Sequence, residues 1–289
     1  MQSNYTSTKS KHIISIALFL QLPSVSSINW IKMNSSSALT TEKRLKDKVA
    51  IITGGASGIG ASTAKLFWEN GAKVVIADIQ DDLGQQIVNN LNNHNIVYFK
   101  CDISNEQNVS DLIDYTISKY GTLDIMYNNA GVRDVSLGSI LDSTEEGLDR
   151  VIRTNLYGSF YGAKHASRVM IPKKRGCILF TSSVCTSIAG IATHPYTMSK
   201  YGVLGLVKNL SAELKEFGIR VNCISPSGVF TGMSKKLEGV RGVLRADDVA
   251  QAALFLASDD AKFVNGHNLI TDGGSSVTSS SMRVAFTSK

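Results

Sequence analysis

The sequence predicts an α/β fold: a three-layer, doubly wound parallel sheet of the Rossmann type, in a single domain. Short apolar runs alternate with helical patterns along the chain, as a parallel sheet covered by helices on both faces requires. A glycine-rich turn follows the first apolar run, and an acidic residue ends the second, which is typical of a dinucleotide-binding unit. At 289 residues, the chain is long enough for one such domain with a sizeable core.

The glycine-rich turn lies at residues 53–60, directly after the apolar run 49–52, which is predicted to be a buried strand. Residues 61–70 follow as an amphipathic helix, and Gly71 stands where a C-terminal cap is expected. Backbone N–H groups and the helix dipole at such a junction hold a pyrophosphate. The turn is therefore predicted to bind the phosphates of a dinucleotide, rather than to be an ordinary tight turn. Its spacing is G-x-x-x-G-x-G and not the common G-x-G-x-x-G, over Gly54, Gly58 and Gly60.

A second predicted strand, residues 73–77, ends in Asp78. An acidic residue about 20 positions after the glycine turn can accept hydrogen bonds from the adenosine ribose, and it repels a 2′-phosphate. No Lys or Arg stands within the turn or directly after Asp78. The sequence therefore favours NAD over NADP, although Asp78 also fits a simple strand-end turn.

The remaining predicted elements alternate in the same way. Strands are predicted over residues 96–101, 123–127, 177–182, 221–225 and 266–274, and helices over 106–120, 144–170 and 247–258. Small residues after the strand 123–127 let the backbone approach a cofactor, and the amides of Asn128 and Asn129 can tie neighbouring strands together.

Tyr196 and Lys200 are four residues apart, about one helical turn, so a helix would place the ammonium beside the phenol. A neighbouring cation favours the ionised phenol and lowers its pKa from about 10 towards neutrality. A phenolate formed in this way can take the proton from an alcohol while hydride leaves. The spacing alone also fits a surface pair on a solvated helix, so its meaning depends on the other motifs.

Four motifs stand in order along the chain: Thr53-Gly54-x3-Gly58-Ile59-Gly60, Asn128-Asn129-Ala130-Gly131, Ser183 and Tyr196-x3-Lys200. Together they resemble the short-chain dehydrogenase/reductase family, over about residues 44–275. Within it, the sequence is similar to plant secondary-alcohol dehydrogenases of the secoisolariciresinol, xanthoxin, borneol and momilactone A synthase type. The resemblance implies NAD-dependent oxidation of a secondary alcohol to a ketone, on a small terpenoid- or phenylpropanoid-type molecule, by a homodimer or homotetramer.

The resemblance also implies the site residues. Ser183 would hold the substrate oxygen near the hydroxyl of Tyr196, which would act as general base. Lys200 would bind the nicotinamide ribose and lower the Tyr196 pKa, and Asn155 would retain a water that relays the proton. The residues expected to contact NAD are Gly54, Ser57, Gly58, Ile59, Gly60, Asp78, Ile79, Asp102, Ile103, Asn129, Ala130, Gly131, Tyr196, Lys200, Val229 and Thr231.

One segment departs from the family pattern. Only fifteen residues, 232–246, separate Thr231 from Asp247, where the related plant enzymes usually carry a longer lid over the substrate. The alternative prediction is therefore an NAD-binding protein with weak or no turnover, acting as a binding or regulatory variant. His194 is expected to face solvent at the start of a helix rather than to line the pocket.

Charge and composition exclude several other classes. Residues 1–48 hold seven basic and two acidic side chains, whereas the rest of the chain holds 23 and 22, so no basic surface for nucleic acid is expected. No stretch approaches the roughly 20 apolar residues of a membrane span. The four cysteines lack any C-x-x-C spacing, so buried thiols are expected and a metal site is not.

The ends of the chain are treated separately from the domain at residues 43–278. Residues 1–42 are expected to be a disordered or targeting extension, and 279–289 a flexible tail. A start at Met33 is preferred over a transit peptide or a secretory signal, and it implies a cytoplasmic enzyme. If residues 1–32 are a transit peptide, the location would be a plastid or mitochondrion.

Overall fold

The computed structural model describes residues 43–91, 93–134, 139–229 and 243–278, all within the compact unit Glu42–Lys289. The predictions for residues 1–42 and 279–289, for Thr231 and for most of the segment 232–246 lie outside the described residues.

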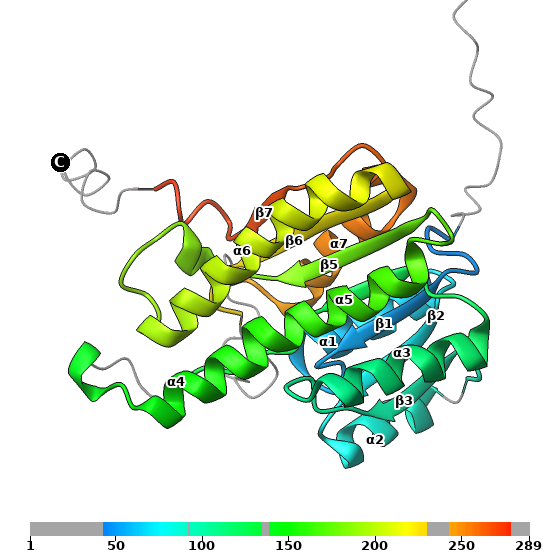
Figure 1. Cartoon of the computed structure of the whole chain (residues 1–289), viewed down its shortest axis with the longest axis horizontal. Helices are drawn as coiled ribbons and strands as arrows, with labels where there is room; N and C mark the ends of the chain where they lie inside the picture. The colour runs from blue at the N-terminus through cyan, green and yellow to red at the C-terminus, as the bar shows by residue number, and fades with distance from the viewer. Residues whose placement is uncertain (1–42, 92, 135–138, 230–242, 279–289) are drawn as a thin grey trace, which may run out of the picture. The chain divides into compact units, whose positions relative to one another are not determined.

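A parallel sheet of seven strands forms the middle layer of this unit (Figure 1). Its order is β3-β2-β1-β4-β5-β6-β7, and every neighbouring pair is parallel. The predicted doubly wound fold is therefore confirmed, and the order of the strands reverses between β1 and β4. The strands are β1 (Val49–Thr53), β2 (Lys73–Asp78), β3 (Ile96–Lys100), β4 (Ile125–Asn128), β5 (Gly176–Thr181), β6 (Ile219–Pro226) and β7 (Asn268–Thr271).

Helices cover both faces of the sheet and form two separate cores with it (Figure 1). One core joins the sheet to α3 (Glu106–Tyr120), α5 (Gly158–Met170) and α6 (His194–Leu214). The other joins it to α1 (Gly58–Glu69), α2 (Asp81–Leu91) and α7 (Ala246–Ala257). The central strands are buried on both sides, which explains why they read as continuous apolar runs rather than as alternating ones.

Two elements differ from the prediction. The single helix predicted over 144–170 is α4 (Glu145–Ile152) and α5, joined by a π-helical turn over Arg153–Tyr157. The last strand is shorter than predicted, since Gly266, Gly273 and Gly274 have positive φ values of 71°, 62° and 85°, which extended strands do not adopt.

Candidate active site

The residues of the candidate site lie where the parallel strands end. Thr53, Asp78, Asn128 and Thr181 are the last residues of β1, β2, β4 and β5, and the carboxyl ends of parallel strands share one edge of the sheet. Ligands of doubly wound sheets bind at this edge, next to the point where the strand order reverses. The strands that carry the predicted nucleotide and proton-transfer residues therefore meet at one position.

The turn between β1 and α1 has the geometry of a phosphate cradle. Gly54 and Gly58 have φ values of 64° and 51°, which suit glycine. A Cβ on Gly60 would lie 2.0 Å from the carbonyl oxygen of Gly54, so this close packing excludes any side chain. Among the described residues, the Ser57 side chain makes no capping hydrogen bond to α1, so the first N–H groups of the helix can bind an anion.

Asp78 lies against this turn at the end of β2. The carboxylate is buried, its Oδ2 accepts the N–H of Ala56 at 3.0 Å, and its Oδ1 accepts the N–H of Gln80 at 3.1 Å. A carboxylate offers about four acceptor positions. Asp78 can therefore stay fixed to the glycine turn and still accept hydrogen bonds from a ribose.

Hydrogen bonds across three strands fix the other side of the turn. Asn129 donates its side-chain amide to the Thr53 carbonyl at 3.0 Å, and Thr53 Oγ1 accepts the N–H groups of Asn129 and Ala130. Thr181 Oγ1 lies 2.9 Å from Asn129 Oδ1 and 2.8 Å from the Tyr127 hydroxyl. The prediction that these asparagines tie strands together is confirmed, since Asn128 also donates to the Leu179 carbonyl. Thr181 and Tyr127 were not predicted as site residues, because a strand-end Thr and a buried Tyr form no distinctive sequence pattern.

Tyr196, Lys200 and Ser183 come together at this edge. The Thr193 hydroxyl caps α6 by accepting the N–H of Tyr196, so Tyr196 and Lys200 lie in the first two turns. The Lys200 ammonium lies 5.4 Å from the centre of the Tyr196 ring, within cation–π range. Ser183, the second residue after β5, lies close enough to the phenol for its hydroxyl to lower the pKa of Tyr196.

Burial dominates the ionisation of this pair. It raises the pKa of Tyr196 above its usual value, although the Ser183 hydrogen bond and the charge of Arg133 lower it in part. Burial also lowers the pKa of Lys200 to about 8, and the ammonium donates to the Thr181 carbonyl at 2.8 Å. The direction for Tyr196 is opposite to the predicted one, because the loss of hydration outweighs the neighbouring positive charges.

Asn155 lies inside the π-helical turn, and such turns are frequent at functional sites. Its Oδ1 accepts the N–H of Val132 at 2.8 Å, and its Nδ2 donates to the Val132 carbonyl at 2.9 Å and to Ser199 Oγ at 3.0 Å. The side chain thus fastens the segment after β4 to α6. The predicted role of Asn155 in holding a water stays a prediction.

The other predicted cofactor residues also follow strands. Asp102 and Ile103 come two and three residues after β3; Ile103 is buried, whereas Asp102 is exposed and accepts hydrogen bonds from Ser104. Ile79, directly after β2, has 63% of its surface exposed, as befits a residue that would cover a ligand. Val229 follows β6 and is partly buried.

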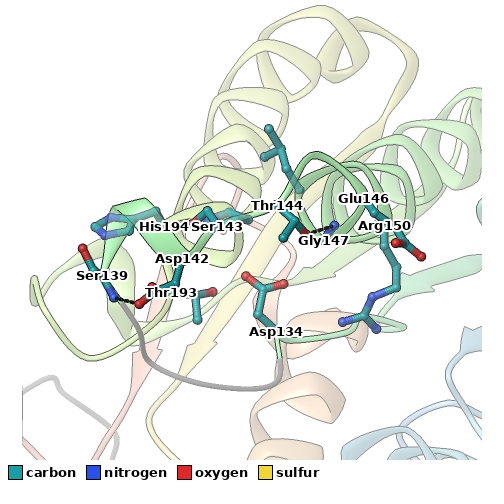
Figure 2. Close-up of a pocket in the computed structure, with 12 residues that line it drawn as sticks. Asp134, Ser139, Asp142, Ser143, Thr144, Glu146, Gly147, Arg150, Thr193 and His194 are labelled. Atoms are coloured by element: carbon teal, nitrogen blue, oxygen red, sulfur yellow. Dashed lines mark hydrogen bonds between the residues drawn. The ribbon is translucent and has the colours of Figure 1, made fainter.

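A polar cavity of about 280 Å³ lies beside the start of the helix that carries Tyr196 (Figure 2). Its wall combines the start of α4 with residues 193–195, and His194 is exposed at this wall. The expectation that His194 is a solvent-facing residue at a helix start is therefore confirmed, but His194 also lines the cavity. Carboxylates and hydroxyls dominate the lining, which includes Asp134, Asp142, Thr144, Glu146 and Thr193.

Neither a metal site nor a membrane span is found in the parts of the chain that the structure describes. Within residues 43–91, 93–134, 139–229 and 243–278, no group of three or more His, Cys, Asp or Glu side chains is arranged to hold a metal ion. No helix in the described part of the chain is both long and apolar enough to cross a membrane. The four cysteines are free and buried, as predicted.

Together, the glycine turn, the acidic strand end and the Ser–Tyr–Lys group define a dinucleotide-dependent α/β oxidoreductase. A family model described as enoyl-(acyl carrier protein) reductase matches residues 54–276. The chain belongs to the short-chain dehydrogenase/reductase family, and family and fold together imply a nicotinamide dinucleotide as cofactor.

Similar proteins agree with this assignment. The chain is 53% identical to (21S)-21-acetoxyl-apo-melianone synthase SDR from Melia azedarach, covering 88% of this chain and 98% of the relative. It is 52% identical to (+)-borneol dehydrogenase 1 from Salvia officinalis, covering 85% and 99%. The solved structure of gox2181 superposes with a TM-score of 0.77 at 29% identity, covering 82% of this chain and 98% of that one. The chain is thus an oxidoreductase related to plant alcohol dehydrogenases.

Proposed function

We propose that the protein oxidises a secondary alcohol to a ketone with NAD as the hydride acceptor. The observation that carries the proposal is the grouping of Ser183, Tyr196 and Lys200 at the carboxyl edge of the sheet, beside the β1–α1 turn. The buried carboxylate of Asp78 next to that turn favours NAD, since it would repel a 2′-phosphate.

Each side chain has a physical task in this proposal. Bound NAD would supply the ring that accepts the hydride and a positive charge beside the phenol. The Ser183 hydroxyl, which lies close enough to the phenol to lower its pKa, would hold the substrate oxygen at the same place. Tyr196 would take the hydroxyl proton. Lys200 would bind ribose hydroxyls and, while charged, stabilise the phenolate.

The cofactor contacts follow from the same edge. The N–H groups of the turn at Ser57, Gly58, Ile59 and Gly60 would bind the pyrophosphate, and the backbone of Asn129, Ala130 and Gly131 would approach the nicotinamide half. A Cβ on Gly131 would lie 3.2 Å from Asn155 Oδ1 and 3.5 Å from Lys200 Nζ, so a bare backbone leaves room there. We extend the proposal to Ile79, Asp102, Ile103 and Val229 by their positions after strands, and to Thr231 by resemblance alone.

For the substrate, we propose a small cyclic alcohol of the terpenoid or phenylpropanoid type. Its support is the similarity to relatives named for melianone and borneol chemistry. The polar cavity next to residues 193–195 (Figure 2) would suit a substrate that carries a further oxygen substituent. The alternative, cofactor binding with feeble turnover, rests on the short segment 232–246.

Assays with a panel of cyclic secondary alcohols distinguish an NAD-dependent dehydrogenase from a cofactor-binding protein with feeble turnover. The panel includes borneol, and we expect at least one of its alcohols to give NADH. With NADP as cofactor, kcat/KM should be at least tenfold lower than with NAD. Reduction of NAD is followed at 340 nm, and NAD affinity is measured by calorimetry. NAD binding without reduction across the whole panel would support the alternative, and preference for NADP would contradict the role of Asp78.

Subunit pairing is proposed on a different face. An apolar groove of about 580 Å³ crosses α5 and α6, and it is lined by Tyr157, Phe160 and Leu206 among others. Tyr157 and Phe160 are 44% and 48% exposed and lie together in this groove, and contiguous exposed apolar surface marks interaction sites. We therefore propose a homodimer or homotetramer. The proposed location is the cytoplasm, from the expected start at Met33.

Lys200→Met is expected to stabilise the fold at neutral pH while it removes activity. The Lys200 pKa is about 8 in the folded chain against 10.5 when unfolded. Below pH 8 the lysine is charged in both states, so the folded state bears the full cost of the buried charge, about 3 kcal/mol. Above pH 10.5 it is neutral in both, and this cost vanishes.

The substitution also loses the hydrogen bond to Thr181, which contributes about 1 kcal/mol. A net gain of about 2 kcal/mol should raise Tm by about 4–8 °C at pH 7, and the gain should shrink by pH 10. Thermal unfolding, monitored by circular dichroism, gives Tm at both pH values. Lys208→Met, at an exposed position of the same helix, is the control and should leave Tm unchanged. An equal rise in Tm at pH 7 and pH 10 would contradict the view that the stabilisation comes from removal of the buried charge.

A further inference from the structure

The strand next to Asp78 ends in a lysine, although no lysine closely follows Asp78 in the sequence. Lys100, the last residue of β3, is paired in parallel register with Asp78, the last residue of β2. Residues in register on neighbouring parallel strands are about 4.8 Å apart and point to the same face. The side chains of Lys100 and Asp78 therefore leave neighbouring strand ends on the same face of the sheet, where the adenosine ribose is proposed to bind.

Asp81 holds this lysine. The Lys100 ammonium lies 2.6 Å from Asp81 Oδ2, and the Tyr98 hydroxyl donates to Asp81 Oδ1 at 2.7 Å. The same hydroxyl lies 2.8 Å from the Asp78 carbonyl oxygen, so Tyr98 links the two aspartates. Lys100 and Tyr98 together lower the pKa of Asp81, which therefore stays ionised.

The cluster has a fixed frame. Gly84 in α2 packs on Tyr98 so closely that a Cβ there would lie 2.1 Å from a ring carbon, so the glycine allows α2 to settle over the tyrosine. Asp81 is the first residue of α2, and a helix N-terminus attracts anions. The Asp81 carboxylate thus lies at the start of α2, three residues after Asp78, and pairs with Lys100.

We propose that Lys100 is a latent 2′-phosphate-binding residue and that Asp81, by pairing with it, is a second determinant of selectivity for NAD over NADP. The inference rests on the proposed function, because it places the adenosine ribose at Asp78. Asp78, Asp81 and Lys100 sum to a charge of −1, which repels a 2′-phosphate. Without the Asp81 charge the sum is zero and the lysine is free to turn towards the ribose. The pair is open to solvent, with 69% and 47% of the two side chains exposed, so its rearrangement costs little.

Adenosine 2′,5′-bisphosphate and 5′-AMP test this directly, since they differ only by the 2′-phosphate and need no turnover. Asp81→Asn keeps the shape and a hydrogen-bond partner for Tyr98 while it removes the charge. We expect its Kd for the bisphosphate to fall about fivefold by calorimetry, with the Kd for 5′-AMP within twofold. The Kd for NADP should fall in parallel, and the Kd for NAD should not change.

Two controls separate release of Lys100 from a general loss of negative charge. Asp82→Asn removes the same charge from the next residue of α2, which is exposed, and should change the bisphosphate Kd less than twofold. In a Lys100→Met background, Asp81→Asn should also gain less than twofold. A full gain in either control would overturn the inference, as would no gain in Asp81→Asn while NAD still binds. If the wild type binds neither NAD nor 5′-AMP, the proposed function is overturned together with the inference.

Discussion

Tyr196→Phe is expected to lower kcat by about 10³-fold, while NAD binds with a Kd within about threefold of the wild type. Phenylalanine keeps the ring, so packing and the contact with the Lys200 ammonium at 5.4 Å from the ring centre persist. Only the hydroxyl that is proposed to accept the substrate proton is lost. Turnover is measured by NADH formation, and affinity by calorimetry.

Tyr201→Phe is the matched control. Tyr201 lies on the same helix with 54% of its surface exposed, so loss of its hydroxyl should change kcat less than twofold. Retention of a tenth or more of the wild-type kcat in Tyr196→Phe would eliminate Tyr196 as the general base.

Gly60→Ala is expected to weaken NAD binding by about 100-fold. The added Cβ would lie 2.0 Å from the Gly54 carbonyl oxygen and 2.8 Å from Asn129 Nδ2. Because the first of these is a backbone atom, no change of rotamer can relieve the clash. The turn must move, and a shift of about 1 Å in groups that position a ligand costs about 100-fold.

Gly205→Ala in α6 is the control for this substitution, since apart from the backbone of α6 itself nothing in the described part of the chain lies within 4 Å of the added Cβ. It should leave NAD affinity unchanged, and alanine should favour the helix. Calorimetric titration of both variants with NAD gives the comparison. An unchanged Kd in Gly60→Ala would show that the turn does not hold the cofactor.

The sequence predicted the fold because buried strands such as β1 and β5 are short apolar runs bounded by turns. The site residues could be located for a related reason: the motifs stand at strand ends, and the ends of parallel strands must meet. The helix Glu106–Tyr120 has the predicted bounds, since it begins after the Asn105 cap and ends at Gly121 with φ 75°.

Other features depend on tertiary packing and leave no local signal. The amino-acid types at Arg153–Tyr157 also occur in ordinary α-helices, so the π-helical turn could not be predicted. The Tyr196 pKa was expected to fall because the sequence shows the nearby lysine but not the burial. Lys100 was overlooked since its position beside Asp78 needs the strand order, which joins residues 22 positions apart.

The hydrogen bonds that join Thr53, Asn129 and Thr181 have a mechanical consequence. Thr181 contacts Asn129 through its hydroxyl and holds Lys200 through its carbonyl, so the turn after β1 and the ammonium on α6 share one rigid support. When a cofactor binds at the turn after β1, the Lys200 ammonium is therefore already in position. Little reorganisation is then needed for the reaction itself. Such preorganisation also means that damage to the support at Thr181 would loosen dinucleotide and proton-transfer groups at the same time.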